Sequence, residues 1–588
     1  MSSLSFRRLP LLAMCTVLAM GLLPTGLQAV PTINALTVHP GTLDVGQPFT
    51  IGVRGTSDGT QGTATVDFRP WAARVMRVTL VEQGALWIGT GTVPADLLPP
   101  VGAKATITAV ILDAARRSAT ASITTDVQTP TAVFSGGVLT VTGTAQNNNI
   151  FVGRNVAGTL AVNHGSIPIT GGIPTVANTT LIRIVGLAGD DFLSLDESFG
   201  ALCPAEITGD AGNDILNGGS FADNLYGGPG RDQLVGKFGD DILFGGDDDD
   251  EFRWNAGDGN DVAEGQNGTD ALVFTGSNAS ENYNLVANGS GFQVFLSVGN
   301  ITMDCAGLER VLVNALGGTD TITATGIPAA AGLQLTFNGG PDTDLLFGGE
   351  SAETFTGGPG DDIIVGGGGD DVVTWSPGGG NDTVEGQGGY DTLLFTGYIG
   401  DERFDVLPNG GRVVLRWNSG SATLDCNDVE DLDVRPLGGV DVVNVNDLAG
   451  TDITHIHLDL SGTSGNGDAV TDRVQVNGTA GDDAISVAGS HATGATIVMG
   501  SLTIAVTGGD FPFDGLFISA LGGADLVEAA ALKAGVLFFA VSGGDGDDIL
   551  VGSDGNDVLS GEAGDDVLIG GPGVDDLYGG TGNNILFQ

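Results

Sequence analysis

The segment that most constrains the fold is 543–587, in which one nine-residue pattern occurs five times in succession. The copies are GGDGDDILV, GSDGNDVLS, GEAGDDVLI, GGPGVDDLY and GGTGNNILF. Glycine predominates at positions one, two and four of the copies, aspartate predominates at position six, and an aliphatic residue stands at position eight. Because glycine enters left-handed backbone without a Cβ clash, the first six residues predict a tight turn. The other three residues are long enough only for a very short strand.

Two such copies complete one coil, and stacked coils predict two short parallel sheets. One aliphatic side chain per copy points inward, so a thin core is expected from Leu550, Leu559, Leu568 and Leu577. The aspartate at position six then lies in the turn, above and below its counterparts in neighbouring coils. The pattern therefore predicts an all-β chain that carries parallel β-rolls.

Two further arrays carry the same pattern. One spans 209–273 and contains a two-residue insertion, Trp254-Asn255, and the other spans 339–394 and contains the insertion Trp375-Ser376. Across the three arrays, the position-six aspartates are the candidate metal ligands: Asp214, Asp223, Asp232, Asp241, Asp250, Asp261, Asp270, Asp344, Asp362, Asp371, Asp382, Asp391, Asp548, Asp557, Asp566 and Asp575.

A longer repeat encloses these arrays. When the sequence is shifted by 121 residues, 254–276 falls on 375–397, and Cys305 falls on Cys426. Two weaker copies flank this pair, which predicts four tandem units of stacked architecture. We place these units at 132–273, 274–394, 395–472 and 473–588, the third without a clear nonapeptide array. About 40 residues of strand-like alternation separate the arrays as β-rich spacers.

The N-terminal part, residues 1–128, lacks the nonapeptide pattern. Residues 1–29 contain two arginines, an apolar run and a final alanine, which is typical of a secretory signal peptide. Residues 30–128 alternate apolar and polar residues in about seven short segments, a pattern that predicts a β-sandwich. The opening of this segment resembles a bacterial immunoglobulin-like domain. No later segment is long and apolar enough to cross a membrane.

The net charge of the chain limits which kinds of molecule it can bind. The chain has a formal net charge of -51, and residues 30–130 hold seven acids and seven bases. The excess of acid therefore lies in the repeats, which excludes nucleic acid as a partner. Aspartates stacked ~4.8 Å apart would repel by roughly 3 kcal/mol per neighbouring pair. One aliphatic residue per copy contributes only about 1.5–3 kcal/mol, so we expect that the arrays do not fold without a cation.

The chemistry of the turns favours calcium over other cations. Ca²⁺ takes six to eight carboxylate and carbonyl oxygens in flexible geometry, and these turns supply both kinds of oxygen. Mg²⁺ demands a stricter octahedron, and zinc favours cysteine and histidine, which the turns lack. The alternative is a solvated acidic surface, as on a salt-adapted protein, but the regular filling of position six argues against it.

The pattern G-G-x-G-x-D-x-U-x resembles the RTX, or haemolysin-type, calcium-binding repeat, most closely at 357–365 and 543–578. The resemblance implies a parallel β-roll in which several Ca²⁺ ions lie between successive coils, held by position-six aspartates and turn carbonyls. It implies these pairs: Asp548 with Asp566, Asp557 with Asp575, Asp214 with Asp232 and Asp250, Asp223 with Asp241, and Asp344 with Asp362.

Several positions depart from the pattern. Glu353 and Asn584 replace the aspartate, so we expect weak sites or caps there. The tryptophan insertions interrupt the period, which predicts that Trp254 and Trp375 cap the end of a roll, with a ligand platform as the alternative. The insertions also predict a shifted register for Asp261, Asp270, Asp382 and Asp391. Full sites are not expected at isolated motifs that lack a partner two copies away: Asp191, Asp320, Asp441, Asp483 and Asp525.

The sequence contains little that indicates a catalytic site. The sequence contains five histidines, and none lies in an H-E-x-x-H motif. The pair His455 and His457 alternates on one strand face without an evident third metal ligand, so a structural role is expected. Cys305 and Cys426 are expected to be buried small hydrophobic residues.

The sequence as a whole predicts a non-enzymatic, secreted, extracellular calcium-binding protein. Its rolls would form a stalk, and its N-terminal domain would be the binding head of an adhesin. The expected partners beyond calcium are polysaccharide or protein at the cell surface or in the matrix. Cell-surface association and the periplasm are the alternative locations. The alternative function is a polysaccharide-active enzyme whose catalytic region lies in the spacers or the N-terminal domain.

Overall fold

The computed structural model describes residues 118–588 except 419–421 and 466, together with the earlier strands 32–39, 43–44, 48–56, 61–67, 75–83, 86–92 and 104–112. The predicted signal peptide at 1–29 lies outside the described residues. The chain divides into two compact units, residues 1–232 and 233–588. The described part contains strands and three short 3-10 turns (Asn163–Gly165, Val298–Asn300 and Ala329–Ala331) but no α-helix. Accordingly, no helix of the described residues could span a membrane.

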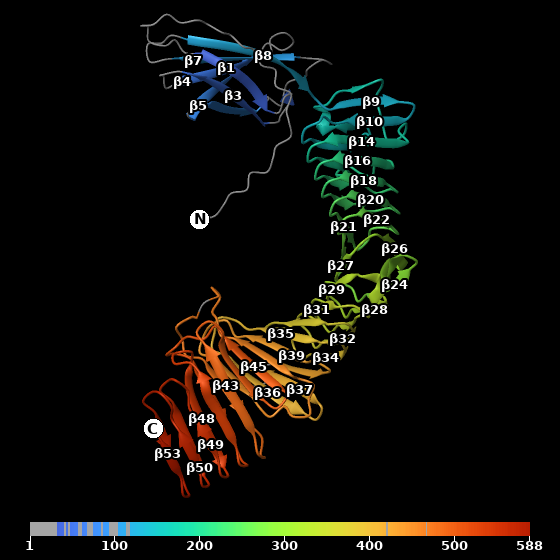
Figure 1. Cartoon of the computed structure of the whole chain (residues 1–588). Helices are drawn as coiled ribbons and strands as arrows, with labels where there is room; N and C mark the ends of the chain where they lie inside the picture. Colours follow the sequence, from blue (N-terminus) through green and yellow to red (C-terminus); the bar gives the residue numbers. More distant parts are fainter. Residues whose placement is uncertain are drawn as a thin grey trace, which may run out of the picture. The chain divides into compact units, whose positions relative to one another are not determined.

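The first unit begins with an antiparallel sheet, coloured blue in Figure 1. Its strand order is β1 (Thr32–His39), β3 (Pro48–Thr56), β6 (Leu86–Thr92), β5 (Val75–Gln83), β4 (Gln61–Asp67), β7 (Lys104–Leu112) and β8 (Ser118–Gln128), and β2 (Leu43–Asp44) pairs parallel to β8. Alternate residues such as Ile51, Val53 and Ile107 are fully buried in one core. The sheet follows from the alternation of apolar residues, and the likeness to an immunoglobulin domain stays a prediction.

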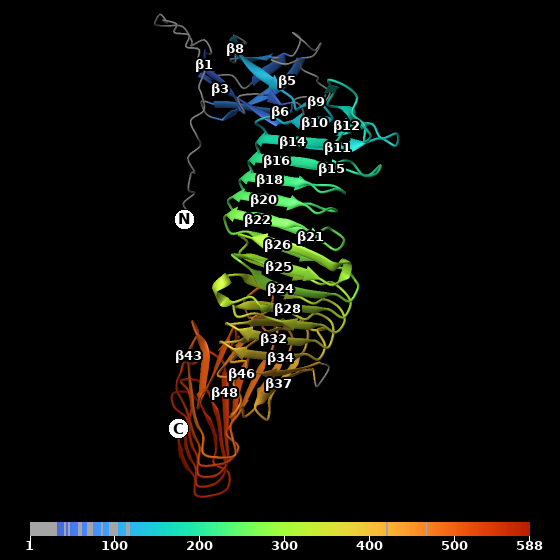
Figure 2. The same ribbon diagram turned by 90° about the vertical axis from the view of Figure 1, so that its right-hand side faces the viewer.

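The remainder of this unit winds into coils with strands on two sheets. One sheet contains β9 (Thr131–Ser135), β10 (Val138–Thr142), β13 (Ile169–Thr170), β14 (Leu181–Ala188), β16 (Ala205–Ala211) and β18 (Asn224–Pro229). The other contains β11 (Asn149–Arg154), β12 (Leu160–Val162), β15 (Phe192–Asp196) and β17 (Ile215–Asn217). Strands that follow one another in the stack are parallel, as in β14, β16 and β18 and in β15 and β17. Figure 2 shows the stacked strands of the first sheet side by side.

The second unit repeats this design over a longer stretch. Its first sheet contains β20 (Ile242–Asp247), β22 (Val262–Asn267), β24 (Asn282–Asn288), β25 (Gly291–Leu296), β26 (Ile301–Ala306), β28 (Thr321–Gly326), β30 (Leu345–Phe347), β32 (Ile363–Gly368), β34 (Thr383–Gly388), β36 (Arg403–Asn409), β37 (Arg412–Trp417), β38 (Ala422–Asn427), β40 (Val442–Val445), β42 (Arg473–Asn477), β46 (Gly515–Ser519), β48 (Phe538–Asp545), β50 (Val558–Ala563) and β52 (Asp576–Tyr578).

The second sheet of this unit contains β19 (Gln233–Val235), β21 (Glu251–Asn255), β23 (Ala271–Thr275), β27 (Arg310–Asn314), β29 (Gln334–Asn338), β31 (Glu353–Thr356), β33 (Val372–Trp375), β35 (Thr392–Thr396), β39 (Asp431–Arg435), β41 (His455–Asp459), β43 (Ala484–Ser490), β44 (Gly494–Met499), β45 (Leu502–Thr507), β47 (Leu526–Leu532), β49 (Ile549–Val551), β51 (Val567–Ile569) and β53 (Ile585–Phe587). The prediction of an all-β chain with parallel rolls is confirmed.

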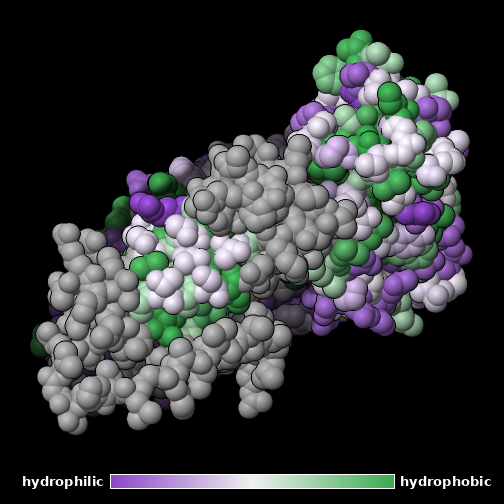
Figure 3. Space-filling view, turned by 90° about the horizontal axis from the view of Figure 1, so that it is seen from above, coloured by the Kyte–Doolittle hydropathy of each residue, from purple (hydrophilic) through white to green (hydrophobic). Residues whose placement is uncertain are grey.

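The core of each coil is one layer of position-eight side chains. Leu550 pairs in register with Leu568, and Leu559 with Leu577, so each coil consists of two copies of the pattern. Leu550, Leu559 and Leu568 are fully buried, whereas Leu577 in the last coils is only half-buried. On the coloured part of the face shown in Figure 3, apolar and hydrophilic residues are interspersed.

The tryptophan insertions lengthen a coil but do not end a roll, so the prediction that they cap it is wrong. Strand β21 pairs with β19 before it and with β23 after it, where Leu272 lies opposite Phe252. Trp254 is fully buried and stacks on Phe274, with ring centroids 4.1 Å apart. Its Nε1 donates to the carbonyl of Gly259 in the following turn. The two inserted residues lengthen strand β21, where Trp254 pairs with Phe274 and Asn255 with Thr275 of β23.

The spacers insert antiparallel meanders into the same two sheets. In the order β22, β26, β25, β24, β28, the outer pairs are parallel and the inner pairs antiparallel. The same arrangement recurs with β36–β38 between β34 and β40, and, on the other sheet, with β43–β45 between β41 and β47. Each spacer therefore returns the chain to the stack at the next coil position.

Candidate metal centre

Several turns of the arrays stack so closely that glycine is favoured at position two. Gly358 has φ +105°, and a Cβ on it would lie 2.2 Å from the carbonyl oxygen of Gly340, its counterpart one coil earlier. Gly228 has the same constraint against Asp210. At these two glycines, left-handed backbone and the close approach of the neighbouring coil both disfavour a side chain.

The position-six aspartates form ladders within the turns. The main-chain N–H of Asp214 donates to Oδ1 of Asp232 (2.7 Å), and that of Asp344 donates to Oδ1 of Asp362 (2.8 Å). The N–H of Asp548 donates in the same way to Asp566 (3.0 Å). The two members of each pair are two copies of the pattern apart and lie on consecutive coils. All sixteen candidate aspartates are 0–5% exposed, which contradicts the alternative of a solvated acidic surface.

The second carboxylate oxygen is buried without a hydrogen-bond partner at many of these turns. Among the described residues, this holds for Oδ2 of Asp214, Asp270, Asp344, Asp362, Asp371, Asp391, Asp548, Asp566 and Asp575. A buried ionised oxygen without a partner is costly, so each of these positions calls for a cation or a proton.

A main-chain carbonyl converges on the same point as the second oxygen. A Cβ built on Gly339, at position one of its turn, would lie 2.4 Å from Asp344 Oδ2 and 2.7 Å from the carbonyl oxygen of Gly357 in the next coil. Gly561 has the same two neighbours, Asp566 Oδ2 at 2.2 Å and the Gly579 carbonyl at 2.7 Å. We call this arrangement an open turn: glycine at position one, a carbonyl of the next coil and an unpartnered position-six oxygen.

Open turns fit a hard cation such as Ca²⁺, which binds carboxylate and carbonyl oxygens together. The described residues contain no group of three or more His, Cys, Asp or Glu side chains that could hold a metal ion. Side chains alone therefore do not form a site, and the carbonyls must contribute. Burial raises the pKa of Asp344 to about 7 and that of Asp371 to about 8, and neighbouring carboxylates add to the shift.

Two of the sixteen candidates lie in turns of a second kind, which we call closed turns. Asp223 Oδ2 accepts the N–H of Gly219, and Asp557 Oδ2 accepts the N–H of Ser553, each at 2.6 Å. The Ser553 hydroxyl also donates to Asp557 Oδ1 (2.7 Å). In a closed turn, the residue at position two turns its own N–H onto the carboxylate and so takes the place of an external partner.

The four candidates that follow the insertions keep their place in the ladder, so the predicted register shift is wrong. The N–H of Asp241 donates to Asp261 Oδ1, and that of Asp250 donates to Asp270 Oδ1, both at 2.8 Å. Asp382 and Asp391 accept in the same way from Asp362 and Asp371 of the preceding coil. The ladder survives because the lengthened coil, 20 residues in place of 18, still brings each aspartate to its place in the turn.

The isolated motifs have ladder partners as well, although none of these partners lies two copies away. The N–H of Asp191 donates to Asp214 Oδ1, 23 residues later, and that of Asp320 donates to Asp344 Oδ1, 24 residues later. The remaining contacts are Asp441 with Asp472, Asp483 with Asp525, and Asp525 with Asp548. A fixed separation of two copies is too strict a criterion, because spacer chain can leave the stack and return one coil later.

Further acids that the nonapeptide pattern did not mark stand in the same ladders: Glu281, Glu309, Glu402, Glu430, Asp472 and Asp514. Glu281 and Glu402 each stand at position six after a position-one glycine, Gly276 and Gly397, which is the signal that could have found them. Glu353 accepts the N–H of Gly349 in a closed turn, and Asn584 accepts the N–H of Asp566.

The other residues considered from the sequence have structural roles. Nδ1 of His457 lies 3.5 Å from Asp433, and its Nε2 bonds to the Thr507 hydroxyl (2.8 Å), so neither nitrogen is left for a metal. Cys305 and Cys426 are free and buried, as expected.

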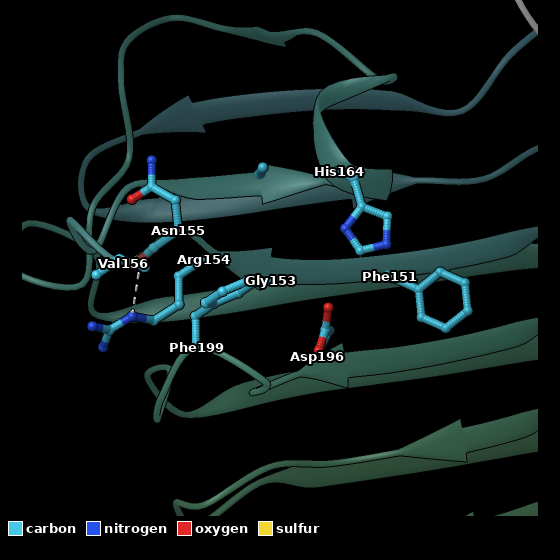
Figure 4. A pocket seen from close by; sticks show the side chains of 9 residues that line it. Phe151, Gly153, Arg154, Asn155, Val156, His164, Asp196 and Phe199 are labelled. Atoms are coloured by element: carbon cyan, nitrogen blue, oxygen red, sulfur yellow. Dashed lines mark hydrogen bonds between the residues drawn. The ribbon is translucent and has the colours of Figure 1, made fainter.

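A cavity of about 260 Å³ lies in the first unit. It is lined by Phe151, Val156, Phe199 and the polar residues Arg154, His164 and Asp196. Figure 4 shows that His164 and Asp196 point into the same space beside Phe151, while Arg154 is directed away from them.

Comparison with known families adds to this geometry. The family model described as RTX calcium-binding nonapeptide repeat (4 copies) matches residues 206–225, 226–253, 338–373, 378–393, 542–577 and 551–586. A comparison with curated proteins gives no match. The matched segments overlap all three arrays and contain most of the open turns. The chain therefore carries RTX calcium-binding nonapeptide repeats.

Proposed function

We propose that this chain is a secreted calcium-binding protein whose arrays fold when Ca²⁺ binds, and that it has a structural or adhesive role at the cell surface or in the matrix. The observation that supports calcium-dependent folding is the row of buried, unpartnered Oδ2 atoms in the open turns. Without a cation, each of these oxygens is desolvated and stands near its counterparts one coil away.

The affinity should suit an extracellular setting. Modules that bind calcium outside cells have Kd values of about 10⁻⁴–10⁻³ M, so the arrays would stay unfolded until export and fold afterwards. The predicted signal peptide at 1–29 supports secretion. The adhesive role is supported by the separation between a charge-balanced N-terminal domain and acidic repeats.

A calcium titration of the full mature chain, followed by circular dichroism, tests the proposal. We expect a steep gain of β signal between submillimolar and millimolar Ca²⁺, reversed by chelator and not reproduced by Mg²⁺. A chain that keeps its full β signal in chelator and takes up no calcium would contradict the proposal.

A second candidate function, a polysaccharide-active enzyme, is supported by one observation. The cavity beside Phe151 brings together His164 and Asp196, two groups able to transfer protons. Deleting residues 30–128 separates the candidates, because an adhesin would lose surface attachment and an enzyme built on residues 151–199 would keep its activity. His164→Ala should abolish hydrolysis of a polysaccharide panel only if the enzyme candidate is right.

A further inference from the structure

One turn with the geometry of an open turn lies outside the three nonapeptide arrays and outside every segment that matches the repeat family. Residues 186–191 have the sequence GLAGDD, with Gly186 at position one and Asp191 at position six. The nearest matched segment begins at residue 206, and the next turn of the same ladder is 209–214. Because Asp191 and Asp214 are separated by 23 residues, a period of nine does not detect the first of these turns.

The carboxylate of Asp191 has one oxygen in use and one without a partner. Oδ1 accepts the N–H of Asn148 (2.5 Å), and the N–H of Asp191 donates to Asp214 Oδ1 (2.7 Å). Asp191 is only 2% exposed, and its Oδ2 has no hydrogen-bond partner among the described residues.

A carbonyl of the following coil faces the unpartnered oxygen. A Cβ on Gly186 would lie 2.2 Å from Asp191 Oδ2 and 2.6 Å from the carbonyl oxygen of Gly209. In the matched turn that follows, the corresponding distances from Gly209 are 2.2 Å to Asp214 Oδ2 and 2.8 Å to the Gly227 carbonyl. The two turns therefore present the same oxygens in the same place.

Asp270 meets the same criteria outside the matched segments, but its turn 265–270 belongs to the first nonapeptide array. The following ladder acids, which lie outside both the arrays and the matched segments, fail one of the criteria. Asp483 Oδ2 accepts the N–H of Thr479, and Glu402 Oε2 accepts that of Tyr398, so both are in closed turns. Asp320 and Asp525 have an unpartnered oxygen, but alanine stands at position one of their turns, with a real Cβ where open turns have none.

We propose that the turns 186–191 and 209–214 together form a calcium site, with Asp191 Oδ2 and the Gly209 carbonyl among its ligands. The site rests on the proposed calcium-binding function and extends it beyond the recognisable repeats. It would attach the longer coil that precedes the first array to that array.

The substitution Asp191→Asn tests this site most directly, and Asp190→Asn is its matched control. Asparagine is already present at position six in this chain, where Asn584 Oδ1 accepts the N–H of Asp566, so Asp191→Asn can keep its ladder bond. Its amide group would replace the oxygen that faces the cation. Asp190 is adjacent, carries the same charge and is exposed, so its variant controls for charge alone.

Native mass spectrometry of the full chain at saturating Ca²⁺ counts the bound ions. We expect Asp191→Asn to carry one calcium ion fewer than the wild type, and Asp190→Asn to carry the same number. A full complement of ions on Asp191→Asn, or an equal loss from both variants, would overturn the proposal. A wild-type chain that binds no calcium would overturn the proposed function as well, whereas a full count on Asp191→Asn overturns this site alone.

Gly186→Ala provides an independent variant in case Asp191→Asn fails to fold. It keeps both carboxylates, and its Cβ fills the space between Asp191 Oδ2 and the Gly209 carbonyl. This variant should also lose one ion, with its circular dichroism spectrum in calcium unchanged. Full occupancy in the folded variant would count decisively against the site.

Discussion

At position two of the turns, backbone strain is concentrated on a few leucines. Leu187, Leu316, Leu437 and Leu521 have φ values of 74–86°, in the left-handed region that leucine rarely enters. Each stands in an isolated motif outside the arrays. Left-handed backbone costs a residue with a Cβ about 1–2 kcal/mol, so the contacts of the stacked coil must hold these residues in place.

Replacing Leu316 by glycine should stabilise the calcium-bound chain by about 0.5–1 kcal/mol. Glycine removes the left-handed penalty of about 1–2 kcal/mol. It also makes the unfolded chain more flexible, which costs the folded state about 0.5–1 kcal/mol. The side chain is 41% exposed, so little packing is lost. Urea unfolding in calcium measures the change, and Leu316→Ala, which keeps the Cβ, should give no such gain.

The opposite change, Gly358→Ala, should destabilise the second array by about 2 kcal/mol or more, because a Cβ meets both a left-handed backbone and the Gly340 carbonyl. The same urea experiment applies. Gly411→Ala is a suitable control, since nothing lies within 4 Å of a Cβ there. Equal effects of the two substitutions would show that the coils do not stack as closely as the structure has them.

At the scale of the turn, the backbone at position two separates open from closed turns. Open turns have a left-handed residue there, such as Gly358 or Glu562, which turns the N–H away from the carboxylate. Closed turns have Gly219 or Ser553 outside the left-handed region, and their N–H groups reach the aspartate. One backbone angle therefore decides whether the second oxygen is left for a cation.

Asp566 and Asp557 should consequently differ as calcium ligands, although both fit the repeat pattern. Asp566 has an unpartnered Oδ2, whereas Asp557 is bonded through both oxygens to Ser553. Native mass spectrometry should show one calcium ion fewer on Asp566→Asn and the wild-type number on Asp557→Asn. The same loss from both variants would mean that closed turns open when calcium binds.

The metal-free arrays should be more stable in mild acid than at pH 8. Burial raises the pKa of Asp344 to about 7 and that of Asp362 to about 6, so in this range the folded state binds more protons than the unfolded state. Stability of the chelated chain therefore falls as pH rises from about 4 through these values. Circular dichroism in chelator between pH 5 and pH 8 measures this, and a stability that rises with pH would contradict it.

At the scale of the whole molecule, the N-terminal sheet and the arrays should respond differently to chelation. Residues 30–130 contain equal numbers of acids and bases, and their core is an apolar cluster that includes Ile51 and Ile107. In calorimetry with chelator present, we expect the unfolding transition of the repeats to disappear or to move to a lower temperature. One other unfolding transition should remain. Deletion of residues 30–128 should remove that remaining transition, and its persistence would assign it to the repeats.

Much of this architecture could be predicted from local sequence. Glycine at position two, aspartate at position six and leucine at position eight are each dictated by the turn or strand of a single copy. Turns, strands, inward leucines such as Leu550 and Leu559, and the pairing of Asp548 with Asp566 follow from a period of nine. The preference for calcium follows from oxygen ligands crowded in one turn.

The nonapeptide pattern alone therefore specifies the repeating coil, its thin aliphatic core and the line of carboxylates that needs a cation. Which distant residues continue that line depends on the folded stack, because the spacers leave the stack and return after 23, 24 or 42 residues, as at Asp191, Asp320 and Asp483. The folded stack also determines which carboxylates keep an oxygen for metal, since that depends on a backbone angle fixed by stacking against the neighbouring coil.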